Sequence, residues 1–318
     1  MKVLEVTSLT KWYGSTRGVE DLSFDIAPGE VYGYLGPNGS GKTTTIRCLM
    51  GLLRPTSGDC FVLGQRVMPG RATQHTRIGY LPGDFRIWPG LTARKSLKLL
   101  AALGNDSNNT SKRCEELAER LDLNLDRRVR TLSKGNRQKV GVVYAFQHQP
   151  DLMILDEPTI GLDPLMRQVV LDLIREASQA GATVLLSSHD LSEVATVCGR
   201  AAILREGRLI ELATVSKIVQ EGRKHLKIWL ANGTRVPSLP ADQLPGVRVI
   251  QQESESLNLS YQGSVGPVLK WLAQYPVDRI STRQTSLEEA FMQYYSKNGL
   301  SGTTTQRDSG PNEVAHEQ

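Results

Sequence analysis

The pattern of apolar and polar positions changes beyond Gly222 of the chain. Before that point, short apolar runs such as Glu30–Leu35 and Ala182–Ser188 have the length of buried strands, and amphipathic stretches between such runs predict helices. The alternation of the two from Ser133 to Leu212 is typical of a parallel sheet covered by helices. We therefore expect an α/β core. Further elements are predicted at Val3–Leu9 and Leu22–Ile26 (strands), Thr92–Leu123 (helical) and Glu206–Ile210 (hairpin).

Beyond Gly222 the pattern predicts a smaller unit of mixed secondary structure. Short strands are predicted at His225–Leu230 and Leu257–Tyr261, and an amphipathic helix at Val265–Tyr275. The segment Ser301–Gln318 is rich in Thr, Ser and Gly and lacks apolar periodicity, which predicts disorder. The expected organisation is a core domain over residues 1–221, an accessory α+β domain over 222–300 and a disordered tail over 301–318.

The segment Gly36–Thr43, with the letters GPNGSGKT, fits the phosphate-loop pattern G-x-x-x-x-G-K-S/T. A predicted buried strand precedes it, and a helix predicted at Thr43–Met50 follows it. The glycines let backbone N–H groups face the phosphates, and the helix N-terminus adds positive potential. Lys42 would reach the β- and γ-phosphates, the Thr43 hydroxyl would ligate Mg²⁺, and Thr44 is placed for a further phosphate contact. The sequence therefore predicts binding of a nucleoside triphosphate with Mg²⁺.

Two carboxylates follow the apolar run Asp151–Leu155. At the carboxyl end of a parallel strand, Asp156 can hold Mg²⁺ through water, and Glu157 can polarise the attacking water as a general base. Read alone, the pair is also compatible with a surface acidic pair after a core strand. His189 follows the run Ala182–Ser188 in the same way. It can hydrogen-bond the γ-phosphate or fix the attacking water, although a lone histidine is usually structural.

Polar residues mark the starts of two predicted helices. Asp190 with Glu193 forms a capping-box pattern for the helix after His189. Ser133 is the expected N-cap of a helix that runs to about Gln147, and such a helix terminus is an anion site through its free N–H groups and dipole. Here the segment Leu132–Val140 reads LSKGNRQKV. It resembles the L-S-G-G-Q signature of the ABC (ATP-binding cassette) ATPases.

The phosphate loop, the signature and the carboxylate strand occur in the order found in ABC ATPases, and the resemblance covers Val3 to about Leu212. It implies a head-to-tail pair, a homodimer or a pair with another ABC subunit, in which each ATP lies between one phosphate loop and the other subunit's signature. It also implies that Tyr13 stacks on adenine, although Tyr13 is compatible with an aromatic on a hairpin face. The loop Gly161–Pro164, with Asp163, would cross the dimer interface, and His189 would be the switch histidine. The implied ATP contacts are Tyr13, Gly36, Asn38, Gly39, Ser40, Gly41, Lys42, Thr43 and Thr44, with Ser133, Gly135 and Asn136 contributed in trans.

Two parts of the chain depart from the family pattern. The usual glutamine after the predicted strand Arg77–Pro82 is replaced by Gly83, which Asp84 follows. In the family that glutamine contacts Mg²⁺ or the water and senses the membrane partner, so Asp84 is the nearest polar candidate for that coupling here. In the signature, Lys134 and Asn136 replace the first glycine and the glutamine. Because the hydrolytic residues are all present, we expect a working ATPase.

Composition agrees with this interpretation. A chain of 318 residues can form one large domain and one small one. The net charge of +5 is well mixed and the densest basic stretch, Arg127–Arg130, is short, so we expect no nucleic-acid partner. The four cysteines are isolated in sequence, which fits a reducing cytosol. No apolar stretch approaches the roughly 20 residues that span a bilayer, and Met1–Glu5 is not a signal peptide, so any pore is expected to be another chain.

The first hypothesis is the ATP-binding and ATP-hydrolysing subunit of a membrane transporter, with ATP and Mg²⁺ as cofactors. It would lie on the cytoplasmic face of the membrane against a separately encoded permease. The segment Thr285–Phe291 resembles the helix that ends many ABC ATPases of the drug and polysaccharide export group, which favours export. The alternative is a soluble ABC ATPase acting on ribosomes or nucleic acid, but this chain has a single cassette and no long heptad run. A third hypothesis, a nucleotide-gated scaffold, is disfavoured because Glu157 and His189 are present.

Overall fold

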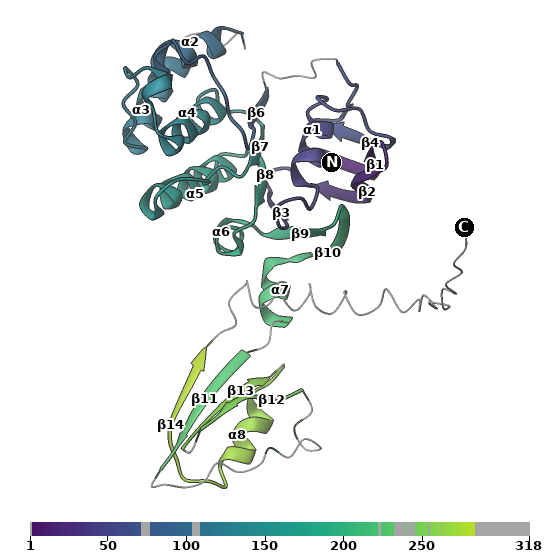
Figure 1. Ribbon diagram of the computed structural model, residues 1–318, viewed down its shortest axis with the longest axis vertical. Coiled ribbons are helices and arrows are strands. Elements are labelled where there is room, and N and C mark those ends of the chain that lie inside the picture. The colour runs from purple at the N-terminus through teal and green to yellow at the C-terminus, as the bar shows by residue number, and fades with distance from the viewer. Residues whose placement is uncertain are drawn as a thin grey trace, which may run out of the picture.

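The computed structural model describes residues 2–70, 77–103, 109–221, 224–231, 239, 244, 246–253, 255–261 and 263–283. The helix predicted at Thr285–Phe291 and the disordered tail predicted at Ser301–Gln318 lie outside these residues. Figure 1 shows a larger body that contains the N-terminus and, beyond α7 (Val215–Glu221), a smaller body of strands with one helix. The α/β fold expected for the core is confirmed.

A six-stranded sheet forms the centre of the larger body, in the order β10-β9-β3-β8-β7-β6. All neighbouring strands pair in parallel except β9 and β10, which are antiparallel and form the predicted hairpin. Three of these strands are buried along their whole length, which explains their uninterrupted apolar runs. The strands are β3 (Val31–Leu35), β6 (Ile78–Leu81), β7 (Leu152–Asp156), β8 (Thr183–Ser188), β9 (Arg200–Arg205) and β10 (Arg208–Thr214).

A second, antiparallel sheet has the order β2-β1-β4-β5. Its strands are β1 (Leu4–Tyr13), β2 (Thr16–Ile26), β4 (Ser57–Val62) and β5 (Gln65–Arg66). It shares one apolar cluster with β3 and with α1 (Lys42–Leu49), the helix that follows the phosphate loop. The first strand is longer than predicted because Tyr13 pairs with Thr16 across a two-residue turn, where Gly14 adopts a φ of 60°. The backbone pairing therefore continues past the apolar residues that the pattern detected.

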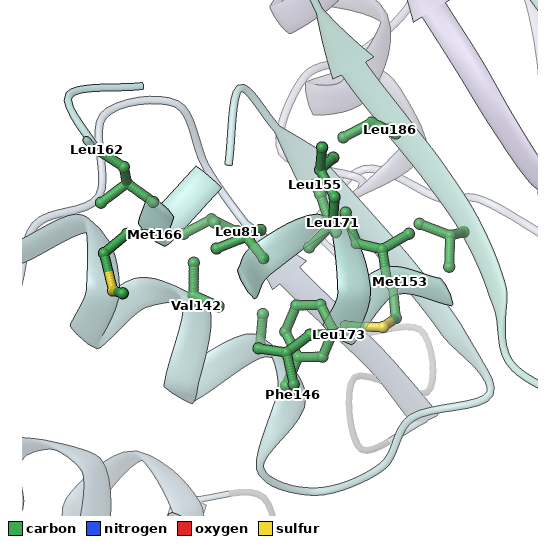
Figure 2. Packing of buried hydrophobic residues seen from close by; sticks show 14 of the residues in the cluster. Leu81, Val142, Phe146, Met153, Leu155, Leu162, Met166, Leu171, Leu173 and Leu186 are labelled. Carbon is green, nitrogen blue, oxygen red and sulfur yellow. The ribbon is translucent and has the colours of Figure 1, made fainter. Parts of the chain in front are cut away.

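Helices cover the other face of the central sheet, where Figure 1 shows α2, α3, α4 and α5. Figure 2 shows side chains from α4, α5, β7 and the loop after β7 gathered in one apolar layer. The basic stretch Arg127–Arg130 leads into a 3₁₀ turn at Val129–Thr131, and its three arginines are exposed. The helices are α2 (Ala93–Leu103), α3 (Asn109–Arg120), α4 (Lys134–Phe146), α5 (Pro164–Gln179) and α6 (Leu191–Val197).

The smaller body is an antiparallel sheet in the order β12-β13-β11-β14, with α8 (Gly266–Leu272) packed on a separate apolar cluster. Its strands are β11 (Lys224–Leu230), β12 (Arg248–Gln252), β13 (Ser256–Tyr261) and β14 (Val277–Arg283). The helix predicted at Val265–Tyr275 is shorter in the structure, because after Leu272 the chain changes to i→i+3 hydrogen bonds, from the Gln274 N–H to Trp271 and from the Tyr275 N–H to Leu272. Two strands, β12 and β14, were not predicted.

Candidate functional site

The phosphate loop lies between β3 and α1, at the carboxyl end of the central strand. Gly39 and Gly41 adopt φ values of 83° and 104°, and a Cβ at Gly41 would lie 2.5 Å from the Val19 side chain. A Cβ at Gly36 would lie 2.4 Å from the Ser40 hydroxyl oxygen. The loop therefore needs glycine for both conformation and space. Gly41 offers no side chain to cap α1, so the N–H groups at this helix terminus are available to an anion.

The Lys42 ammonium group is buried inside this loop. Its Nζ donates to the Gly36 carbonyl oxygen at 2.5 Å and lies 3.2 Å from Glu157 Oε1, an ion pair without hydrogen-bond geometry. Only 6% of the Lys42 side chain and 13% of the Glu157 side chain are exposed. The phosphate loop and the acidic strand end, 115 residues apart in sequence, are thus joined by an ion pair in which each charge compensates the other.

Asp156 and Thr43 lie side by side, as the sequence predicted for a shared Mg²⁺ site. The Thr43 hydroxyl donates to Asp156 Oδ2 at 2.8 Å, and the Ser187 hydroxyl donates to Asp156 Oδ1 at 2.5 Å. Asp156 is 1% exposed. A hydroxyl and a carboxylate this close present the oxygen donors that Mg²⁺ prefers, so these residues fit the ion.

Glu157 is held in an unusual backbone conformation beside His189. Its φ is 54°, a left-handed value that is costly for a residue with a Cβ and that is often found at functional sites. Its N–H donates to the Ser187 carbonyl oxygen of β8 at 3.1 Å. The Glu157 Oε2 atom lies 2.6 Å from His189 Nδ1, and the imidazole is half exposed. The base predicted from the sequence therefore has an orienting partner within hydrogen-bond distance.

Tyr13 extends from the end of β1 over the same region. Its hydroxyl shares a hydrogen bond with the Thr44 hydroxyl at 3.3 Å, and the side chain is half exposed. A cavity of about 310 Å³ is bounded by Tyr13, the phosphate loop and Glu157. The described residues that line it include none from the signature. One chain therefore brings together the predicted ATP contacts but not the signature residues expected in trans.

The signature residues lie at the start of α4, as predicted. Ser133 is the N-cap, and its Oγ accepts a hydrogen bond from the Asn136 backbone N–H at 3.2 Å. A Cβ at Gly135 would lie 2.6 Å from the carbonyl oxygen of Gly161. Gly135 is therefore required by packing within the chain, in addition to any contact with a nucleotide.

The ABC transporter family model matches residues 19–160, from β2 through the phosphate loop and the signature to the loop after Glu157. The bacitracin transport ATP-binding protein BcrA of Bacillus licheniformis is 32% identical over 300 residues, which are 91% of this chain and 96% of BcrA. The chain belongs to the ABC transporter family. The Nod factor export ATP-binding protein I of Cupriavidus metallidurans is 34% identical over 250 residues, covering 77% and 79% of the two chains.

A solved ATP-binding subunit of an ABC transporter superposes with a TM-score of 0.63 at 34% identity, covering 68% of this chain and 91% of that one. This ABC ATPase is thus an ATP-hydrolysing subunit that works with a separate permease. The comparisons give no support to the alternative role on ribosomes or nucleic acid. Among the residues that the structure describes, none of the helices is both long and apolar enough to cross a membrane.

Gly83 lies directly beside the predicted Mg²⁺ position of this ABC ATPase. A Cβ at Gly83 would lie 3.3 Å from Asp156 Oδ2, so a glutamine at this position would point toward the carboxylate. Asp84 points elsewhere: its side chain is 71% exposed and pairs with Arg86 at 2.7 Å. The hydrogen bond from Arg86 lowers the pKa of Asp84. Asp84 is therefore a charged surface residue next to the site and not a replacement for the missing amide.

The structure shows how Asp163 and Asp190 cap the helices α5 and α6. Asp163 caps α5, and its Oδ1 accepts from the Met166 N–H at 3.0 Å, a hydrogen bond that lowers the pKa of Asp163. The capping box predicted for α6 is half wrong. Asp190 caps the helix, but Glu193 accepts from the Ser188 hydroxyl at 2.9 Å instead of reaching back to the Asp190 N–H. That N–H donates to the Ser188 hydroxyl, and burial raises the pKa of Glu193.

Sequence reasoning missed two polar residues of the site. Ser187 orients Asp156 from the neighbouring strand, and only its position at the carboxyl end of β8 could have indicated this. Gln138 is buried on α4, and its amide donates to the carbonyl oxygens of Glu157 and Pro158. The sequence does offer one indication that Gln138 is buried: it lies four positions before the apolar Val142, and residues four apart share one face of a helix.

Proposed function

We propose that this ABC ATPase powers export through a separate permease and that it lies on the cytoplasmic face of the membrane. The observation that carries the proposal is the convergence of Lys42, Thr43, Asp156 and Glu157 at one edge of the parallel sheet. The direction of transport is supported by relatives named for bacitracin transport and Nod factor export. The proposed organisation is a nucleotide-binding domain over residues 1–221, an accessory domain over 222–300 and a disordered tail over 301–318.

ATP would bind across the cavity between Tyr13 and the phosphate loop. The Lys42 ammonium would exchange the Gly36 carbonyl and the Glu157 carboxylate for the β- and γ-phosphates. Loop N–H groups from Asn38 to Thr44 would complete the phosphate contacts, and the Tyr13 ring would stack on adenine. Thr43 and, through water, Asp156 would hold Mg²⁺, which neutralises charge on the phosphates when it is bound.

Hydrolysis would begin at the Glu157 carboxylate. This group would accept the proton of the attacking water, and His189 would orient the carboxylate through the contact at Oε2. The left-handed backbone of Glu157 directs its side chain toward both Lys42 and His189, so the base and the phosphate-binding lysine lie in one cluster. Charge on the γ-phosphate would be stabilised by Lys42 and by donors that a second subunit contributes.

That second subunit is proposed to contribute Ser133, Gly135 and Asn136, with its Asp163 loop crossing the interface. The support is that Ser133 is exposed at the free N-terminus of α4, a 13-residue helix, and that none of the described signature residues lines the cavity in its own chain. The two sites of a dimer would therefore each combine parts of both chains.

Mixing two inactive variants tests this sharing. Ser133→Arg removes the cap and places a bulky cation in the interface, whereas Lys42→Ala damages the phosphate loop. Each variant alone is expected to lack turnover, and the mixture is expected to regain ATPase activity, because a mixed dimer gathers both lesions at one site and leaves the other intact. Steady-state phosphate release measures the recovery. An inactive mixture whose mixed dimers are confirmed by native mass spectrometry, or a fully active Ser133→Arg protein, would exclude a shared site.

Asp84 provides a test of communication with the permease. Asp84→Ala is expected to lower the permease-stimulated ATPase rate more than the basal rate of the isolated subunit, because the residue lies near the site, is exposed and pairs with Arg86, which is also exposed. Arg86→Ala is the matched control, since it breaks the same ion pair and leaves the carboxylate in place. Equal losses in the stimulated and basal rates would assign Asp84 to hydrolysis or structure instead.

A further inference from the structure

We propose that Gln138 is a positioning residue that fixes the general base Glu157 and links it to the signature helix. The proposal rests on the general-base role given to Glu157 above. Gln138 is 5% exposed, and its Nε2 donates to the carbonyl oxygens of Glu157 and Pro158, each at 3.1 Å. Both amide hydrogens are thus used on two consecutive carbonyls. Because a buried donor left without an acceptor is costly, this contact strongly favours one placement of the Glu157 peptide.

The Glu157 backbone is held from opposite sides. Its N–H donates to Ser187 of β8 at 3.1 Å, and its carbonyl oxygen accepts from Gln138 and from the Ile160 N–H, the latter at 3.3 Å. A left-handed φ of 54° persists only where the surroundings determine it. Without the amide of Gln138, the backbone can relax toward a less strained conformation. The carboxylate would then move away from His189 Nδ1 and from the position at which it polarises water.

The helix that carries Gln138 is firmly packed against the same loop. Figure 2 shows Val142 and Phe146 of α4 in the apolar layer that includes Leu155 of β7 and Leu162 of the loop. Gly135 allows the N-terminus of α4 to approach the Gly161 carbonyl closely. The helix and the loop after β7 therefore form one packed unit, and a displacement of α4 is transmitted to Glu157.

Ser133, proposed to contact the nucleotide of the other subunit, lies five residues before Gln138. At a helical rise of 1.5 Å per residue this is about 7.5 Å along the axis of α4. One rigid helix thus carries two contacts: Ser133 at its start would contact the γ-phosphate bound by the other subunit, and Gln138 contacts the Glu157 backbone of its own subunit. Closure of the dimer onto Ser133 would therefore set the position of Glu157 through Gln138.

Gln138→Met preserves the length of the side chain and removes both donors. We expect kcat for ATP hydrolysis to fall about tenfold, since small displacements of a catalytic group are costly, while KM and the Kd for ATP stay near the parental values. Gln147→Met is the matched control, because Gln147 is also a buried glutamine but lies at the C-cap of α4, nine residues beyond Gln138. It is expected to retain the parental kcat. Gln138→Asn, a shorter amide, provides a second variant and is expected to lose part of kcat.

A double variant separates positioning from general damage. In the Glu157→Gln background, Gln138→Met is expected to cause no further loss of the residual rate, because both changes act through the same carboxylate. The positioning role is wrong if both Gln138 variants keep the parental kcat. It is also wrong if kcat and ATP affinity fall equally and Gln147→Met shows the same falls. Either result would leave the proposed function intact. Parental turnover in Glu157→Gln alone would overturn the general-base role and the positioning role together.

Discussion

Glu157→Gln is expected to bind ATP and to hydrolyse it on the order of a hundred-fold to a thousand-fold more slowly than the parent protein. The amide has the size of the carboxylate but cannot accept a proton from water. It also lacks the negative charge that lies 3.2 Å from Lys42, so the lysine is more available to phosphate and ATP affinity is expected to rise. Single-turnover phosphate release and ATP titration measure the two effects, and light scattering should detect an ATP-dependent dimer.

Glu193→Gln is the control for this experiment. Glu193 is another buried carboxyl group near the same sheet edge, but it bonds to Ser188 and belongs to α6. The substitution makes the same chemical change outside the proposed reaction path, so turnover should remain close to that of the parent. If both variants hydrolyse ATP at the parental rate, Glu157 is not the base. If both lose activity equally, the effect of removing a buried carboxylate is structural.

Lys42→Ala is expected to abolish turnover and to weaken ATP binding about a hundred-fold, because the phosphates lose their principal point charge. The buried Glu157 carboxylate also loses its compensating cation, and its negative charge then repels the nucleotide. Isothermal titration calorimetry measures the affinity. Lys11→Ala is the control, since the Lys11 ammonium lies near Tyr13 but donates to the Arg54 carbonyl outside the site. Unchanged ATP affinity in Lys42→Ala would refute the phosphate-loop assignment.

Elements governed by short-range patterns were predictable from the sequence. The phosphate loop, the cap at Ser133 and the strand that ends at Asp156 each depend on neighbouring residues, and the structure has them within a residue or two of the prediction. The ion pair between Lys42 and Glu157 was not predictable in this way. Both residues were assigned to phosphate and water, and only the folded sheet places one charge against the other.

Two further features were not predicted because the side chains bond to groups that are distant in sequence or not marked by spacing, and one strand was not predicted because it lacks a pattern. Glu193 has the spacing of a capping box, but the Ser188 hydroxyl at the end of β8 offers a buried partner that sequence spacing does not reveal. Gln138 appeared as one polar residue in a helix because its two acceptors are carbonyls about 20 residues away in the chain. β12 is exposed along its whole length at the edge of its sheet, so it has no alternation of apolar and polar residues to detect.

The ion pair between Lys42 and Glu157 implies that this chain masks the carboxylate that we propose as the base. Glu157 Oε1 lies 3.2 Å from the Lys42 ammonium, so the carboxylate proposed to accept the proton of water is already paired with a cation. When phosphates draw Lys42 away, the same carboxylate would lose this partner and become available to water at the moment when a substrate is in place. Binding of the nucleotide would then both supply the substrate and free the Glu157 carboxylate, because Lys42 changes its partner from Glu157 to the phosphates.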